Sequence, residues 1–246
     1  MRILVYGAGV LGSYLAHELV RGGNDITMLA RGSRADELEK SGNVIRHYLQ
    51  LRTTVDKVTV IRELLPGDIY DLIFVVMKYP DFEAVLPALA ANHSTHVIIM
   101  GNNASPVEMR KYLQTNSPVE KKVAFAFQSL AGWRETGRVN CVRGPQLGLA
   151  YGGLGEQLSW RPVMDQAFKN TRYNMTYYTN MDEWLKSHFV LILPLNRISV
   201  SYQGDLRKAA KDKRLLNYVM DAIDEGHQVL KENGYAIMPA AQEQFV

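Results

Sequence analysis

Residues 2–12 read RILVYGAGVLG, the stretch that decides the fold of the N-terminal region. Arg2–Tyr6 is a short run of β-favouring residues, and an apolar helical pattern follows the glycines. Gly7, Gly9 and Gly12 separate the two patterns with G-x-G-x-x-G spacing. A strand, a glycine turn and a helix in this order predict the dinucleotide-binding turn of a Rossmann domain; the alternative is a plain tight turn.

Each glycine has its own physical task in such a turn. The first makes the tight turn, the second lets the backbone approach a pyrophosphate, and the third lets the helix pack closely on the strand. The backbone N–H groups that open the helix then face the phosphates. The predicted cofactor-binding stretch comprises Gly7, Ala8, Gly9, Val10, Leu11 and Gly12.

The residue after the second predicted strand indicates which cofactor binds. That strand covers Ile26–Ala30, and Arg31 follows it nineteen residues after Gly12. NAD-binding domains usually carry Asp or Glu here, whereas a guanidinium pairs with a 2′-phosphate. We therefore expect NADP(H), with Ser33 and Arg34 as candidate helpers. The alternative is a solvated surface arginine at the start of a loop.

The chain alternates between strand and helix patterns as far as residue 179. Continuous apolar runs at Leu72–Met77 and His96–Met100 are typical of strands buried on both faces of a parallel sheet. Further strands are expected at Val123–Phe127 and Met175–Thr179. An alternating stretch over residues 44–60 predicts a hairpin-like insertion whose pairing the sequence leaves open. The alternation predicts an α/β domain with a Rossmann-type doubly wound parallel sheet over residues 1–179.

Polar residues follow two of these strands. Lys78 comes after the first apolar run, and Asn102 and Asn103 come shortly after the second. Ligands of open α/β sheets bind beyond the carboxyl ends of the strands, which makes Lys78 and Asn102 candidate cofactor residues. The alternative is that these residues only start loops, a role that asparagine fills readily.

The pattern becomes helical after Thr179. Asn180 with Glu183 predicts a helix N-cap, and a second amphipathic helix is expected over residues 215–233. We therefore predict an all-α C-terminal domain over residues 180–246. A helical unit of this size seldom buries enough apolar surface to be stable alone. It would need further helices, the first domain, or a second copy in a homodimer.

Composition excludes several classes of protein. The net charge of +3 and the lack of basic clusters interleaved with aromatic residues argue against a nucleic-acid partner. The longest apolar run, Phe189–Leu195, is far shorter than the about 20 residues that cross a bilayer. His93 and His96 have no third ligand nearby, so no metal site is predicted. Cys141 is the single cysteine, which excludes an internal disulfide and favours a cytoplasmic location.

Five stretches together resemble the ketopantoate reductase family of NADP-dependent enzymes, which reduce 2-dehydropantoate to pantoate. The resemblance covers residues 1 to about 200. It implies that Arg31 holds the 2′-phosphate and that Asn102 bridges the nicotinamide half of the cofactor and the substrate. It also implies that Lys186 is the acid/base, although periodicity alone favours an exposed helix lysine there. The stretches are RILVYGAGVLGSYLA, TMLARGSR, DLIFVVMK, VIIMGNN and DEWLKSHF.

The chain also departs from the family pattern. Val190 and Pro194 occupy the places of two asparagines that reach the substrate, and the family's later Ser and Glu have no counterpart before Val246. The resemblance therefore implies that the helical substrate or dimerisation domain, residues 180–246, is truncated. Arg197, about three turns after Lys186, is the remaining candidate substrate ligand. The function expected is NADPH-dependent reduction of a small 2-oxo acid, 2-dehydropantoate first. The alternatives are a related reductase with a more apolar substrate and a non-catalytic NADP(H)-binding regulatory protein.

Overall fold

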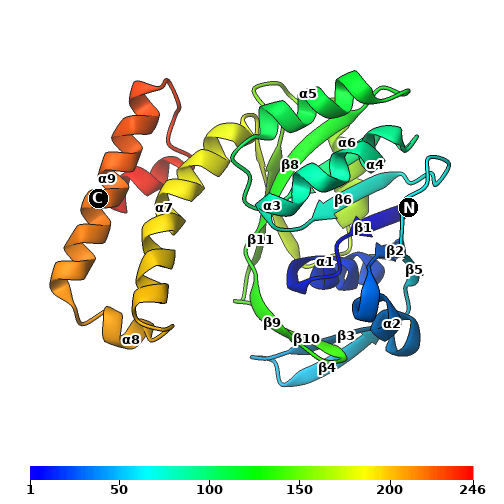
Figure 1. Cartoon of the computed structure of the whole chain (residues 1–246), viewed down its shortest axis with the longest axis horizontal. Coiled ribbons are helices and arrows are strands. Elements are labelled where there is room, and N and C mark those ends of the chain that lie inside the picture. The colour runs from blue at the N-terminus through cyan, green and yellow to red at the C-terminus, as the bar shows by residue number, and fades with distance from the viewer. Residues whose placement is uncertain (246) are drawn as a thin grey trace. The chain divides into compact units, whose positions relative to one another are not determined.

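The computed structural model describes residues 1–245 of the chain. The chain divides into two compact units, Met1–Thr179 and Asn180–Val246. The first unit contains every strand of the described residues together with several helices, and the second contains helices only (Figure 1). This composition confirms the predicted fold class, an α/β domain followed by an all-α region.

A large sheet of eight strands forms the centre of the first unit, in the order β12-β11-β8-β7-β6-β1-β2-β5. Neighbouring strands are parallel except for β8 and β11, so the sheet is mixed at one position rather than wholly parallel. The strands are β1 (Arg2–Tyr6), β2 (Asp25–Leu29), β5 (Thr59–Ile61), β6 (Leu72–Val76), β7 (His96–Met100), β8 (Lys122–Gln128), β11 (Leu147–Gly152) and β12 (Tyr173–Tyr178).

Helices cover both faces of this sheet. The strand order reverses between β1 and β6, and right-handed crossovers therefore place α1 on one face and α4 and α5 on the other. Figure 1 shows α4 and α5 side by side, and the two helices are in contact. The helices are α1 (Val10–Arg21), α2 (Gly32–Ser41), α3 (Tyr79–Phe82), the 3₁₀ turn η1 (Glu83–Val85), α4 (Leu86–Ala91), α5 (Pro106–Asn116) and α6 (Arg161–Phe168).

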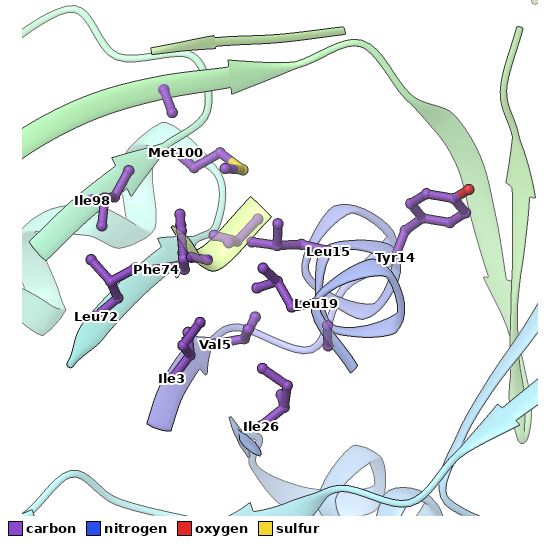
Figure 2. Close-up of a cluster of buried hydrophobic side chains, with 14 of the residues drawn as sticks. Ile3, Val5, Tyr14, Leu15, Leu19, Ile26, Leu72, Phe74, Ile98 and Met100 are labelled. Atoms are coloured by element: carbon purple, nitrogen blue, oxygen red, sulfur yellow. The ribbon is translucent and has the colours of Figure 1, made fainter. Parts of the chain in front are cut away.

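The core packs α1 against alternate residues of the central strands. Leu15 and Leu19 of α1 point toward Val5, Phe74 and Met100, which come from three neighbouring strands (Figure 2). All five side chains are fully buried. Such packing fixes the position of α1 on the sheet, and with it the position of the glycine turn between β1 and α1.

A second, four-stranded sheet has the order β4-β3-β10-β9 and contacts α1. The predicted insertion over residues 44–60 forms its hairpin, since β3 and β4 pair antiparallel, while the last part of that stretch becomes β5 of the large sheet. The other two strands come from much later in the chain, and β10 pairs with β3 in parallel. The strands of this small sheet are β3 (Asn43–His47), β4 (Arg52–Asp56), β9 (Ala131–Glu135) and β10 (Arg138–Val142).

A buried polar cluster lies between α1 and the small sheet. His17 Nδ1 on α1 lies 2.9 Å from Asp56 Oδ2, and His47 Nε2 lies 2.8 Å from Thr54 Oγ1. The centroids of the two imidazole rings are 5.0 Å apart. Burial, and after it the neighbouring His17, lowers the pKa of His47 from 6.5 to about 4. His47 is therefore neutral in the folded protein at neutral pH.

We expect acid to destabilise the protein through His47. The unfolded chain binds a proton at this imidazole below about pH 6.5, whereas the folded chain binds it only near pH 4. The stability that this group contributes is thus present above pH 6.5 and is lost as the pH falls toward 4. The free energy of unfolding should drop by about 2 kcal/mol between about pH 7 and pH 5 from this group. Urea unfolding of wild type and His47→Gln at both pH values measures the drop, and an unchanged pH dependence in the variant would contradict the prediction.

The second unit consists of α7 (Met181–Ser201), α8 (Leu206–Ala209), α9 (Lys213–Glu232) and the 3₁₀ turn η2 (Ala240–Phe245). The Asn180 side chain accepts hydrogen bonds from the backbone N–H groups of Asp182 and Glu183, which confirms the predicted N-cap of α7. Within residues 1–245, no helix combines the length and the apolar content that crossing a bilayer requires.

Only part of the apolar stripe predicted on α9 is buried. Val219 and Ile223 pack with Ile198 of α7, whereas Leu216 and Met220 are more than a third exposed. The stripe is therefore wider than the face that α7 covers.

Candidate functional site

A cavity of about 380 Å³ opens at the carboxyl ends of β1 and β2. Gly7, Ala8, Gly9 and Arg31 line it, so the structure brings together two features that the sequence pointed to separately. Val10, Leu11 and Gly12 complete the glycine motif but do not line the cavity. They form the first turn of helix α1. The carboxyl ends of the strands are where open α/β sheets bind their ligands.

The backbone of the turn requires glycine at its first and last positions. Gly7 has φ +123°, and a Cβ there would lie 2.1 Å from the carbonyl oxygen of Val76. A Cβ at Gly12 would lie 1.9 Å from the carbonyl oxygen of Gly7. Side chains at these positions would therefore push β1, β6 and α1 apart.

Gly9 differs, because a Cβ there would have no atom of the described residues within 4 Å. The open space lies beside the start of α1, where Gly9 is the N-cap and no side chain caps the helix. The first turn also contains no acidic residue. Uncapped N–H groups at the positive end of a helix form a site for an anion.

Arg31 stands at a second helix N-terminus. It is the N-cap of α2, whose first turn likewise has no acidic residue and no side-chain cap. Its Nη2 donates a hydrogen bond of 2.9 Å to the hydroxyl of Tyr6, which holds the guanidinium at the cavity. A fixed guanidinium next to free helix N–H groups is suited to a phosphate.

Arg34, the candidate helper of Arg31, lines the same cavity and also has a structural role. Its side chain is buried, and three of its donors are used within the protein. Nε donates to the carbonyl of Ala8 at 3.1 Å, Nη2 donates to Ser13 Oγ at 3.0 Å, and Nη1 donates to Glu37 Oε2 at 3.1 Å. Burial lowers the pKa of Arg34, and the hydrogen bond that Arg34 donates to Glu37 opposes this shift. Arg34 thus ties α2 to the glycine turn, a role that no spacing in the sequence indicates.

Asn102 and Lys78 lie beyond the ends of the adjacent strands β7 and β6, where Val76 and Met100 are paired. The side-chain oxygen of Asn102 is buried and has no hydrogen-bond partner among residues 1–245. Asn103, by contrast, uses its side-chain oxygen to accept from the N–H of Ser105 at 2.9 Å. The two asparagines therefore differ in hydrogen bonding, since only Asn102 keeps an unpaired acceptor among the described residues, although Asn102 is not one of the residues that line the cavity.

The side chain of Lys78 is exposed, and Lys78 is the N-cap residue of α3. Met77 and Pro80, on either side of it, line the cavity, but Lys78 does not. Its role in cofactor binding stays a prediction.

Lys186 and Arg197 both lie on α7 in the second unit. The ammonium of Lys186 forms an ion pair with Asp182 one turn earlier and lies 4.7 Å from the centre of the Tyr235 ring. Arg197 is exposed and lies beyond Pro194, which stands inside the helix. Figure 1 shows the axis of α7 bending part-way along its length, as a proline inside a helix causes.

Val190, which replaces an asparagine of the family pattern, contributes to packing in the second unit. A Cβ at Gly226 of α9 would lie 2.6 Å from Val190 Cγ1, so the two helices approach closely at this point. An apolar side chain fits this contact, and an asparagine would bring an amide that needs hydrogen-bond partners. In the part of the chain that the structure describes, no group of acidic, histidine or cysteine residues is arranged to hold a metal ion.

Known proteins similar to this chain share its fold. The solved structure of D-mandelate dehydrogenase with NADH and anilino(oxo)acetate has a TM-score of 0.82 at 15% identity, over 97% of this chain and 76% of that one. The PanE/ApbA family ketopantoate reductase from Ralstonia eutropha JMP134 has a TM-score of 0.77 at 18% identity, over 96% of this chain and 76% of that one. At these identities the similarity shows the fold alone.

Sequence comparison identifies the family. The "Uncharacterized oxidoreductase YkpB" of Bacillus subtilis (strain 168) is 49% identical over 45 residues, which is 18% of this chain and only 15% of that relative. Residues 3–145, more than half of the chain, match the family model described as ketopantoate reductase PanE/ApbA. The resemblance seen in the sequence is thereby confirmed: this chain belongs to the ketopantoate reductase PanE/ApbA family.

Proposed function

We propose that the protein is an NADP(H)-dependent oxidoreductase that reduces a small 2-oxo acid, with 2-dehydropantoate as the first candidate substrate. The proposal rests on one observation: the glycine turn and Arg31 line the same cavity. Its family and the D-mandelate dehydrogenase that shares its fold with bound NADH support a nicotinamide cofactor.

The residues of the first unit fit such a cofactor. The open space beside Gly9 and the uncapped start of α1 suit the pyrophosphate. Arg31 and the start of α2 suit a 2′-phosphate, because the first turn of α2 contains no acidic residue that would bond the ribose hydroxyls of NAD(H) or repel the phosphate. The free oxygen of Asn102 could accept a hydrogen bond from an amide such as that of nicotinamide.

Arg31→Ala is expected to weaken NADPH binding by about tenfold or more and to leave NADH binding unchanged, since one charge-assisted pair with the 2′-phosphate is lost. Fluorescence titration of both reduced cofactors measures the effect. Arg62→Ala is a matched control, because Arg62 is an exposed arginine of the same unit that pairs with Asp36 and Glu39 outside the cavity. Equal affinity of the wild type for NADH and NADPH would contradict the proposed preference.

The chemical step needs a proton donor as well as a cofactor. NADPH, when bound, supplies a hydride, and negative charge then grows on the oxygen of the 2-oxo group. We assign the donation of a proton to that oxygen to Lys186, whose ammonium also stabilises the charge. Arg197 is the candidate partner of the substrate carboxylate, since a guanidinium matches two carboxylate oxygens.

A related reductase with a more apolar substrate is the second candidate. It is favoured by Val190, which removes a polar group at a position where the family pattern carries asparagine, and by a fold shared with D-mandelate dehydrogenase. The two candidates are separated by kcat/KM for ketopantoate and for 2-oxo acids with branched or aromatic side chains. A preference for ketopantoate supports the first candidate, and a preference for an apolar acid supports the second.

A further inference from the structure

We propose that Arg134, on strand β9 of the small sheet, binds a phosphate group of the dinucleotide, so that the small sheet forms part of the cofactor site. The inference rests on the proposed function and extends it to an element outside the Rossmann turn. Arg134 lines the same cavity as Gly7, Gly9 and Arg31, although more than a hundred residues separate it from them in sequence.

The geometry of β9 directs Arg134 toward the cofactor turn. Side chains alternate between the two faces of a strand, so Gly132 and Arg134 share one face while Trp133 and Glu135 share the other. Trp133 Nε1 donates to Glu135 Oε1 at 2.9 Å, as expected for neighbours on one face. A Cβ at Gly132 would lie 2.8 Å from Cγ1 of Val10, the first residue of α1. The face that carries Arg134 therefore packs against the start of α1.

The charges around the cavity are unbalanced. Three arginines line it, and Asp81 is the one carboxylate among the lining residues. The charge of Arg34 is compensated by Glu37 at 3.1 Å. Arg134 has no ion pair and no hydrogen bond from its side chain among residues 1–245, and its positive charge contributes to the lowered pKa of Arg34. Cations held together without counter-charges form a site for an anion.

Arg138, a second arginine of the small sheet, provides a comparison for Arg134. Arg138 is the first residue of β10, directly after the two-residue turn that follows β9, and pairs with Glu135 at 2.6 Å. It does not line the cavity. Of these two arginines, Arg138 has its charge satisfied, whereas the guanidinium of Arg134 is left for a ligand, and a guanidinium binds two phosphate oxygens at once.

The dinucleotide offers two sources of phosphate. Gly132 approaches Val10, so β9 lies beside the start of α1, where a pyrophosphate would bind. The charge of Arg134 also acts on Arg34 of α2, and the start of α2 is where a 2′-phosphate would bind. ADP carries the first group and adenosine 2′-phosphate carries the second. Binding of these two fragments therefore identifies the phosphate that Arg134 contacts.

The test is titration of NADPH, ADP and adenosine 2′-phosphate into wild type, Arg134→Ala and the matched control Arg138→Ala. Thermal unfolding of each variant verifies that it is folded, which is expected because both side chains are exposed. We expect Arg134→Ala to bind NADPH about tenfold more weakly and Arg138→Ala to bind it within about twofold of wild type. Arg134→Glu should weaken binding further, since it replaces an attraction with a repulsion.

A selective loss of ADP affinity in Arg134→Ala supports a contact with the pyrophosphate, and a selective loss of adenosine 2′-phosphate affinity supports a contact with the 2′-phosphate. Unchanged NADPH affinity in a folded Arg134→Ala overturns the inference but leaves the proposed function intact. A wild type that binds neither NADPH nor NADH overturns the proposed function, and the inference with it.

Discussion

Lys186→Ala is expected to lower kcat by about a hundredfold or more while leaving NADPH affinity unchanged, because the variant loses the proposed proton donor and no proposed cofactor contact. Lys186→Arg should not restore activity. A guanidinium keeps the positive charge but does not release its proton. Both results would separate proton donation from simple charge stabilisation.

Two further variants test whether a loss of kcat in Lys186→Ala has a structural cause. Removing Lys186 leaves the carboxylate of Asp182 without its ion pair, so Lys186→Gln, which retains a shorter, uncharged hydrogen-bond donor, should be measured beside the alanine variant. Lys208→Ala removes an exposed lysine of α8 and should leave kcat unchanged. Wild-type kcat in Lys186→Ala on any accepted substrate would show that another group donates the proton.

Gly12→Ala is expected to abolish NADPH binding and to lower the free energy of unfolding by about 3 kcal/mol. The added Cβ would lie 1.9 Å from the carbonyl oxygen of Gly7, which is backbone and cannot move aside like a flexible side chain. Helix α1 must then lift from β1, and overpacking of a buried contact typically costs about 1 to 3 kcal/mol. Urea unfolding and NADPH titration measure the two effects.

Gly9→Ala provides the matched control at the other side of the same turn. Its Cβ would meet no atom of the described residues within 4 Å, and Gly9 has φ −74°, so the variant should fold as stably as wild type. The methyl group would nevertheless occupy the open space proposed for the pyrophosphate. NADPH affinity should therefore fall in both variants, whereas stability should fall only in Gly12→Ala. Unchanged NADPH affinity in Gly9→Ala would place the cofactor elsewhere.

The large sheet could be predicted because its signals are local. The run RILVY, the glycine spacing after it and the continuous apolar stretches at β6 and β7 each specify a strand or turn within a few residues. The order of the strands then follows from right-handed crossovers, which restrict the possible topologies. Asn180 likewise specified the start of α7 by its own side chain.

The small sheet could not be predicted, because its strands come from segments that lie far apart in the sequence. Asn43–His47 pairs with Arg138–Val142, and an alternating strand can pair with many partners of similar pattern. Arg134 was missed for the same reason: β9 is exposed along its whole length and reads as a loop in the sequence. The packing of β9 beside the start of α1, where Gly132 approaches Val10, brings this arginine to the glycine turn.

The sequence also did not show which of two neighbouring polar residues is available to a ligand. Asn102 and Asn103 are consecutive residues just after β7, and Arg31 and Arg34 stand in one short segment. Their side chains differ in what they contact, since Asn103 and Arg34 are used inside the protein while Asn102 has a free acceptor. Hydrogen bonding in three dimensions, rather than residue type, separates candidate ligands from structural residues here.

The central claim is tested most directly by following the absorbance of NADPH while the protein is mixed with a panel of 2-oxo acids that includes ketopantoate. We predict that NADPH is consumed in the presence of at least one of these acids, and that NADH is consumed much more slowly at the same concentration. Lack of NADPH consumption with every acid, in a protein that binds NADPH, would contradict the proposed reductase and indicate a non-catalytic cofactor-binding protein instead.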